Sequence, residues 1–353
     1  MRTNPVKQRL MKYLFLRILF FLPLISFSQN VKYKLETFVP EKENYTFRTI
    51  SFIVPAFDRK QKIDSVSFEG SLIIPKNGFD KIVIIKPGTG YNTRNTHSYL
   101  AETLLDNNIA VFRYDERGNG NSNGEGGIDM HYTATMMGAE LASAFTMLKK
   151  QPELQDKKFG VIGHSLGGVA TIDALKYNIN PDFLVLLATL VVTGKQLFLY
   201  QLENEENGFN DYFLYDTLEE KQEICSKMID FYIANQNEKK YYNKFKKNNR
   251  SIGYKNNRYS TRFPFLLGQT EKDLIKKDNS ELIKNLQIPL LYLIGDKDVL
   301  VSPNANIDIL KNYNNSNIYT IIIKDENHFF ANGESYEMNE NPKSLIVDWI
   351  LKQ

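Results

Sequence analysis

The sequence predicts an α/β fold in which a mostly parallel, twisted sheet is covered by helices on both faces. Between residues 81 and 187, short apolar segments of strand length alternate with longer segments of helical periodicity. The strand segments are apolar along nearly their whole length, which is typical of parallel strands buried on both faces. Strands and helices that alternate in this way form one sheet with helices packed against it.

The segment before residue 29 differs from the rest of the chain. Residues 1–28 carry five basic side chains and no acidic one, and an apolar run at 18–27 ends in small residues. This order is typical of a secretory signal peptide. The alternative is a membrane anchor, but Arg17 and Pro23 interrupt the run, and a span needs about 20 apolar residues. We expect a signal peptide at 1–28, a mature chain in the periplasm or medium, and no lasting membrane anchor.

The remaining chain, 29–353, is expected to form one α/β domain that carries an insertion. Two strands are expected at 46–57 and 64–75, because a polar turn at 58–62 joins these segments. The segment 133–150 places Met136, Leu141 and Leu148 at helical spacing. The other expected elements are strands at 81–86, 109–114, 158–162, 182–187, 289–294 and 318–323, helices at 95–106 and 168–177, and a last helix with Asn341 as N-cap and Pro342 as its first residue.

Residues 190–288 interrupt the alternation and predict an inserted helical cap. Thr217 and Glu220 form a capping box in front of an amphipathic segment. Eight acids and one base lie in 203–223, whereas nine bases and no acid lie in 239–262, interleaved with tyrosines. We favour two solvated helical faces that partly neutralise each other. A basic, aromatic-rimmed mouth for an anionic substrate is the alternative.

Composition excludes several classes of protein. A formal net charge of +3 over 353 residues is too small to indicate a nucleic-acid binder. The single cysteine, Cys225, excludes an internal disulfide framework and a cysteine-based zinc site. We expect no metal and no cofactor.

The strongest motif is Gly163-His164-Ser165-Leu166-Gly167, a G-x-S-x-G sequence. An apolar strand precedes it and a helix of small residues follows it, which is the context of a nucleophile elbow. The glycines leave room for a tight turn, and the helix N-terminus behind Ser165 favours developing negative charge. We therefore expect Ser165 to be a nucleophile.

A serine nucleophile needs a general base and a group that orients this base. The chain has four histidines, and we interpret His97 and His131 as surface or cap residues and His164 as pointing away from the base position. His328 follows the strand 318–323, so it reaches the carboxyl edge of the sheet, where ligands bind. Asp298 follows the strand 289–294 at the same edge, with Asp296 as the alternative acid.

An oxyanion hole requires two backbone donors. We expect the N–H of Leu166, next to the nucleophile, to supply one. The loop Lys86-Pro87-Gly88-Thr89-Gly90 follows the third strand, and its glycines allow close backbone approach. We expect the N–H of Thr89 to supply the other.

Taken together, these motifs resemble the α/β-hydrolase superfamily across residues 65–353. The order Ser165, Asp298, His328 is that of these enzymes. The segment Arg113–Ser122 is similar to their D-x-R-G-x-G-x-S turn, and Gly88-Thr89-Gly90 is similar to the G-S-G loop of exported bacterial serine esterases and their prolyl-oligopeptidase and serine-aminopeptidase relatives. Pro87 departs from the His-Gly sequence of many relatives at this loop.

The resemblance implies an exported serine hydrolase, with hydrolysis of a carboxylic ester as the expected reaction. A peptidase acting on short peptides is the alternative, since Glu203, Glu205 and Glu206 could hold a free N-terminus. Thioesterases and acyltransferases share the motifs. An inactive binding protein on the same scaffold is the most distant alternative. The expected partner is a small ester or short peptide, not a nucleic acid.

Overall fold

The computed structural model describes residues 33–38, 42–55, 65–124, 132–205, 207–237, 241–255, 266, 268–331 and 337–353. The predicted signal peptide, His131 and Glu206 lie outside these residues. Within the described ranges, no helix is long and apolar enough to cross a membrane. Residues 34–353 form one structural unit.

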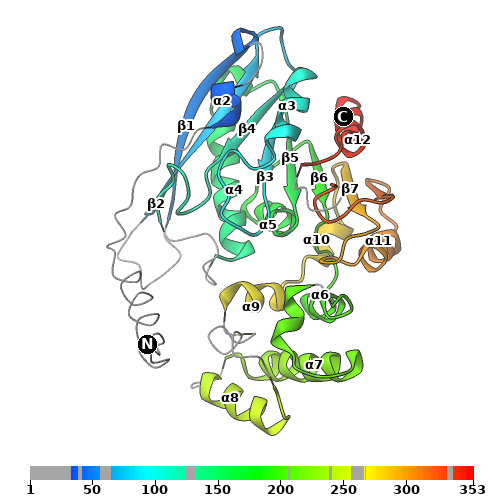
Figure 1. Cartoon of the computed structure of the whole chain (residues 1–353). Helices are drawn as coiled ribbons and strands as arrows, with labels where there is room; N and C mark the ends of the chain where they lie inside the picture. The colour runs from blue at the N-terminus through cyan, green and yellow to red at the C-terminus, as the bar shows by residue number, and fades with distance from the viewer. Residues whose placement is uncertain are drawn as a thin grey trace, which may run out of the picture. The chain divides into compact units, whose positions relative to one another are not determined.

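One eight-stranded sheet forms the centre of this unit, in the order β1-β2-β4-β3-β5-β6-β7-β8 (Figure 1). At one edge of the sheet β1 pairs antiparallel with β2, and β2 pairs antiparallel with β4. Every later pairing is parallel. The predicted α/β fold with a mostly parallel sheet is thereby confirmed. The strands are β1 (Tyr45–Pro55), β2 (Ser65–Pro75), β3 (Lys81–Lys86), β4 (Ile109–Tyr114), β5 (Lys158–His164), β6 (Phe183–Leu187), β7 (Leu290–Gly295) and β8 (Ile318–Ile323).

Helices cover both faces because the direction of the crossovers reverses at β3. Helix α3 (Ser98–Asp106) leads from β3 to β4, whereas α4 (Ala134–Lys149) and α5 (Leu166–Ala174) lead across the sheet in the other direction. Right-handed crossovers in opposite directions place their helices on opposite faces. Accordingly α4 packs against α5, and α12 (Glu340–Leu351) packs against α3. Such a reversal opens a ligand crevice outside the carboxyl ends of the strands.

Three helix starts differ from the prediction. Helix α3 begins at Ser98 and not at residue 95. The last helix has Asn339 as its N-cap, two residues before Asn341, so Pro342 is its third residue. Proline fits any position of the first turn, because the N–H that it lacks would have no helical acceptor there. Helix α5 begins at Leu166 and not at Gly168, directly after Ser165.

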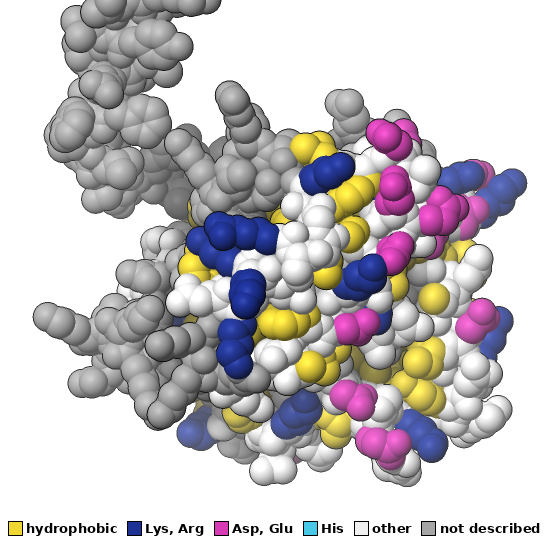
Figure 2. All heavy atoms as spheres, turned by 90° about the horizontal axis from the view of Figure 1, so that it is seen from below, with side chains coloured by type: hydrophobic (Ala, Val, Ile, Leu, Met, Phe, Trp, Pro, Cys, Tyr) yellow, Lys and Arg dark blue, Asp and Glu magenta, His cyan; other side chains and the backbone are white. Residues whose placement is uncertain are grey.

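The chain between β6 and β7 folds into helices with an apolar cluster of their own. Thr217 and Glu220 form the predicted capping box of α7, and Cys225, Met228 and Tyr232 are buried in the cluster. On the face that Figure 2 shows, acidic side chains gather toward one side, whereas basic ones lie on both sides. The helices are α6 (Gly194–Gln201), α7 (Leu218–Asn235), α8 (Tyr241–Ser251), α9 (Gln269–Lys276) and α10 (Ser280–Lys284); α2 (Lys34–Phe38) precedes the sheet, and α11 (Pro303–Asn312) links β7 to β8.

Candidate active site

Ser165 occupies the sharp turn between β5 and α5. Its backbone has φ 54° and ψ −123°, a conformation that residues other than glycine rarely adopt. Its N–H donates to the carbonyl of Leu187 on the neighbouring strand β6 at 2.8 Å. Strain of this kind persists only where the surroundings hold it, and it is concentrated at functional sites. The structure therefore has the strand–turn–helix geometry that the G-x-S-x-G motif predicts.

Two glycines allow the loop after β3 to contact this turn. A Cβ atom on Gly88 would lie 2.8 Å from the Cβ of Ser165, and one on Gly167 would lie 2.2 Å from the carbonyl oxygen of Pro87. Side chains at these positions would push the loop away from the serine. The loop that contains Thr89 thus lies beside Ser165, and Leu166 opens α5 with an N–H that no helical carbonyl accepts.

His328 and Asp298 are brought together by the loops after β8 and β7. The Nδ1 atom of His328 lies 2.7 Å from Oδ2 of Asp298, and both side chains are buried. Oδ1 of Asp298 accepts hydrogen bonds from the N–H groups of Leu300 and Val301 at 2.8 and 2.9 Å. The carboxylate is therefore held rigidly against the imidazole. No hydrogen bond joins Ser165 to His328 in the described structure, an arrangement common before substrate binds.

Asp296, the alternative acid, is placed elsewhere. Its side chain is exposed, and its Oδ1 accepts a hydrogen bond from the N–H of Asp325 at 2.7 Å. Of the two aspartates after β7, only Asp298 contacts His328.

His164 contacts the residue predicted to be the base. Its Nε2 lies 2.9 Å from the backbone oxygen of His328, and since a carbonyl only accepts, Nε2 carries the proton. Burial, together with the neighbouring His97 and His328, lowers the pKa of His164 well below its usual value. His164 is thus a neutral donor that connects the nucleophile turn to the loop of His328.

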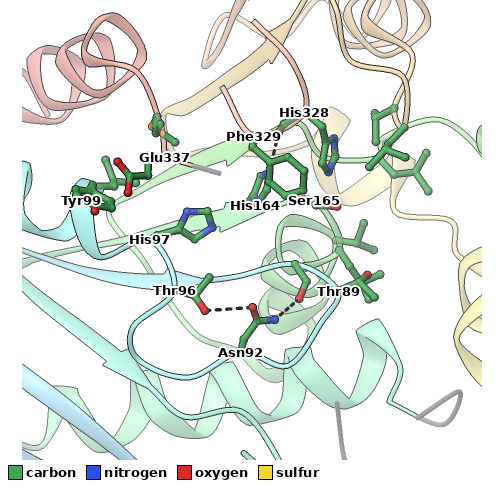
Figure 3. A pocket seen from close by; sticks show the side chains of 18 of the residues that line it. Thr89, Asn92, Thr96, His97, Tyr99, His164, Ser165, His328, Phe329 and Glu337 are labelled. Carbon is green, nitrogen blue, oxygen red and sulfur yellow. Dashed lines mark hydrogen bonds between the residues drawn. The ribbon is translucent and has the colours of Figure 1, made fainter. Parts of the chain in front are cut away.

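His97 is the N-cap residue of α3, as one of the two expectations had it, but its side chain takes no part in capping. Its side chain makes no cap hydrogen bond to α3, and its ring lies edge-on to that of His164, with 5.0 Å between centroids. The rings of His164 and His328 are also 5.0 Å apart, so three histidines lie in a row (Figure 3).

A buried polar network supports the loop of Thr89. The Nδ2 atom of Asn92 donates to the Gly88 carbonyl at 2.8 Å and to Oε2 of Glu116 at 2.9 Å, and its Oδ1 accepts from Thr96 at 3.2 Å. Glu116 also forms a buried ion pair with Lys86, the last residue of β3. Burial opposes the charge of Lys86, but the carboxylate of Glu116 and other nearby groups outweigh it and raise its pKa above the usual value. The turn after β4 therefore anchors the loop after β3.

Helix α6 contacts the loop of Asp298. The hydroxyl of Tyr200 donates to the backbone oxygen of Asp298 at 2.6 Å, and the Gln201 amide donates to that of Leu300 at 3.1 Å. Asn207, just beyond the helix, donates to the backbone oxygen of Val299 at 3.2 Å. The helical segment after β6 thus fixes the loop that orients His328.

A pocket of about 600 Å³ connects these residues. Ser165, Leu166, Thr89 and His328 all line it (Figure 3), whereas Asp298 lies behind His328. Sequence reasoning missed three contributors to this site: Asn92, the Lys86–Glu116 pair and the contact of His164 with His328. A lysine at the end of an otherwise apolar strand was the one available signal, because a buried lysine needs a carboxylate.

The sheet order, the nucleophile turn and the histidine–aspartate pair define an α/β-hydrolase. Residues 78–332 match the family described as serine aminopeptidase, S33 (Hydrolase_4), and the chain belongs to this family. No curated protein sequence matches the chain.

Three solved esterase structures share the fold at low sequence identity. An esterase from Pyrococcus furiosus has a TM-score of 0.54 and 17% identity, over 89% of this chain and 95% of its own. A thermophilic esterase from Thermogutta terrifontis, with malate bound, has a TM-score of 0.52 and 18% identity, over 86% and 98%. The esterase Est1E from Butyrivibrio proteoclasticus, with ferulic acid bound, has a TM-score of 0.50 and 18% identity, over 82% and 96%.

Proposed function

We propose that this α/β-hydrolase is a carboxylic ester hydrolase that acts through Ser165, His328 and Asp298. The observation that carries the proposal is the placement of Ser165 and His328 on one pocket, with Asp298 2.7 Å behind the histidine. The esterases that share its fold support the choice of ester substrates.

In this mechanism, the Ser165 hydroxyl attacks the ester carbonyl while Nε2 of His328 takes its proton. The N–H groups of Leu166 and Thr89 stabilise the oxyanion that forms on the carbonyl oxygen. His328 then gives its proton to the departing alkoxide, which leaves as an alcohol, and the acyl group remains on Ser165. Water, deprotonated by His328, attacks the acyl-enzyme and releases the carboxylic acid. Asp298 orients the imidazole and stabilises its positive charge throughout.

We also propose that the helical segment 190–288 is a cap that selects the substrate. Leu197 and Phe198 of α6 and Leu274 of α9 line the pocket on this side, and they favour an apolar acyl or alcohol group.

The export of the mature chain, beginning at residue 29, is also part of the proposal. N-terminal sequencing of the protein recovered outside the cytoplasm would test it, and an intact residue 1 there would contradict it.

The esterase activity is tested with p-nitrophenyl esters of increasing acyl length and with a fluorophosphonate label. Wild-type protein should hydrolyse the esters and take up the label at Ser165. Ser165→Ala and His328→Ala should each lose on the order of 10⁴-fold in turnover, and Ser165→Ala should take up no label. Ser226→Ala, which removes an exposed hydroxyl on α7, is the matched control. Full activity of Ser165→Ala would overturn the proposal.

An aminopeptidase is the second candidate, because the family match is to serine aminopeptidases. Glu203 and Glu205 are exposed, and neither is among the residues that line the pocket of Ser165. The acidic residue in the described lining of that pocket is Glu337. Amino-acid p-nitroanilides measured beside the esters separate the two functions. Faster release of nitroaniline than of nitrophenol, at matched concentrations, would favour the peptidase.

A further inference from the structure

The pocket has two chemically different walls. One wall, next to the α6–α10 segment and the loop after β7, is mostly apolar, with Gln201 as a polar member and the apolar residues Leu190, Leu197, Phe198, Leu274, Leu300 and Val301. The other wall comes from the start of α3 and the residues before α12, and it includes Asn95, Thr96, His97, Tyr99 and Glu337. Ser165 and His328 belong to the same pocket, so a substrate at the serine contacts both walls. This asymmetry fits an ester with one apolar side and one polar side.

His97 is the residue of the polar wall with unused hydrogen-bonding capacity. Its Nε2 is buried and has no hydrogen-bond partner among the residues that the structure describes. Its backbone has φ 57° and ψ 31°, the left-handed conformation, yet the side chain does not cap the helix that begins beside it. This atom has almost no accessible area in the structure, so the His97 ring must rotate for a ligand to reach it. A buried polar atom without a partner costs free energy, which a ligand bound to the rotated ring recovers.

The chemistry of the imidazole limits the ligand group. Burial lowers the pKa of His97 to about 4, so the ring is neutral at physiological pH. A neutral imidazole has one nitrogen that donates and one that accepts. A hydroxyl group can do both, so it suits either tautomer. The carboxylate of Glu337 and the ammonium group of Lys34, which lies over the Tyr99 ring, both line the pocket, so the charges on this side do not select an ionised ligand group.

The position of His97 relates this group to the reacting centre. The ring of His97 lies 5.0 Å from that of His164, which lies 5.0 Å from that of His328 (Figure 3). Since His97 and Ser165 line the same pocket, one substrate can reach both with a hydroxyl at His97 and an ester carbonyl at Ser165.

We propose that the pocket takes esters in which one side of the ester bond is apolar and the other carries a hydroxyl group that binds to His97. This inference rests on the proposed esterase function and adds the substrate class. It assigns His97 a role in specificity, separate from the chemistry at Ser165.

Matched ester pairs, in which a hydroxyl replaces a methyl of similar size, test the inference. The acyl-side pair is butyl 6-hydroxyhexanoate and butyl heptanoate, and the alcohol-side pair is 4-hydroxybutyl butyrate and pentyl butyrate. The measured quantity is the ratio of kcat/KM within each pair, by titration of the released acid. In His97→Phe this ratio should fall about tenfold for at least one pair, the value of one neutral hydrogen bond, while the methyl member changes less than about threefold.

His97→Gly provides a second variant in case phenylalanine does not fold in a left-handed conformation, and it should show the same fall in ratio. Thr103→Val, which removes an exposed hydroxyl from α3 outside the pocket lining, should keep the wild-type ratio. Unchanged ratios in both His97 variants, with all four esters still hydrolysed, would overturn the inference and leave the esterase function standing. A fall in Thr103→Val as large as in the His97 variants would overturn it as well. No hydrolysis of any ester by wild-type protein, together with no fluorophosphonate label, would instead contradict the esterase function itself.

Discussion

We expect the position of the loop that carries Thr89 to depend on the side-chain amide of Asn92. Replacing Asn92 by leucine keeps the side-chain size but removes the hydrogen bonds to the Gly88 carbonyl at 2.8 Å and to Glu116 at 2.9 Å. One of these bonds goes to a neutral acceptor and the other to a carboxylate. Their combined loss should lower the free energy of unfolding by about 2–4 kcal/mol. For a domain of this size, that corresponds to a fall in Tm of roughly 3–6 °C.

The effect on catalysis should be larger than the effect on binding. Once the Gly88 carbonyl is released, the N–H of Thr89 is no longer aimed at the oxyanion, while that of Leu166 keeps its place at the start of α5. Removal of one oxyanion donor costs about 10²–10³-fold in kcat, and a displaced loop should cost somewhat less, about 10–100-fold. KM should change less than about threefold, because the donor acts on the transition state.

The assay is steady-state hydrolysis of p-nitrophenyl butyrate at a temperature at which the variant is folded, with Tm measured in parallel. The matched control is Asn107→Leu, which removes an exposed amide bond to the Thr103 carbonyl at the end of α3. It should leave kcat and KM close to those of the wild type. A lower Tm with unchanged kcat in Asn92→Leu would show that the network stabilises the fold without positioning the oxyanion loop, and would refute the reasoning.

Two further predictions concern the acid and the histidine row. Asp298→Asn should lower kcat/KM by roughly 10³–10⁴-fold, whereas Asp296→Asn, at an exposed position, should stay within about threefold; the reverse order would transfer the role to Asp296. Burial lowers the pKa of both His97 and His164, so the unfolded chain binds more protons than the folded one below pH 6.5. Their contribution to stability is complete above pH 6.5 and declines as the pH falls toward 4. The fall in Tm between pH 7 and pH 5 should therefore be smaller in His97→Phe than in wild type, and equal falls would show that His97 is not held neutral by the fold.

Much of the site was predictable because its residues follow strands of one parallel sheet. Ser165, Asp298 and His328 each come after a different apolar segment, and the carboxyl ends of parallel strands meet at one edge. The glycines around Ser165 indicated a tight turn, and the structure shows that Cβ atoms on Gly88 and Gly167 would not fit there. Local chemistry and strand order were sufficient to predict that these three residues lie at one edge of the sheet.

The sequence by itself determined the fold class, and it predicted the sharp turn at Ser165 and the loops that carry Asp298 and His328. Only the tertiary structure distinguished Asp298 from Asp296, because two residues of one loop differ in which neighbouring loop they face. It also placed Asn92 beside Glu116 and His97 beside His164, contacts between segments that no periodicity relates. Periodicity and motif spacing report where a strand ends and which face of an element is buried. The direction of a polar side chain in a loop depends on partners that only the folded chain brings within hydrogen-bond distance.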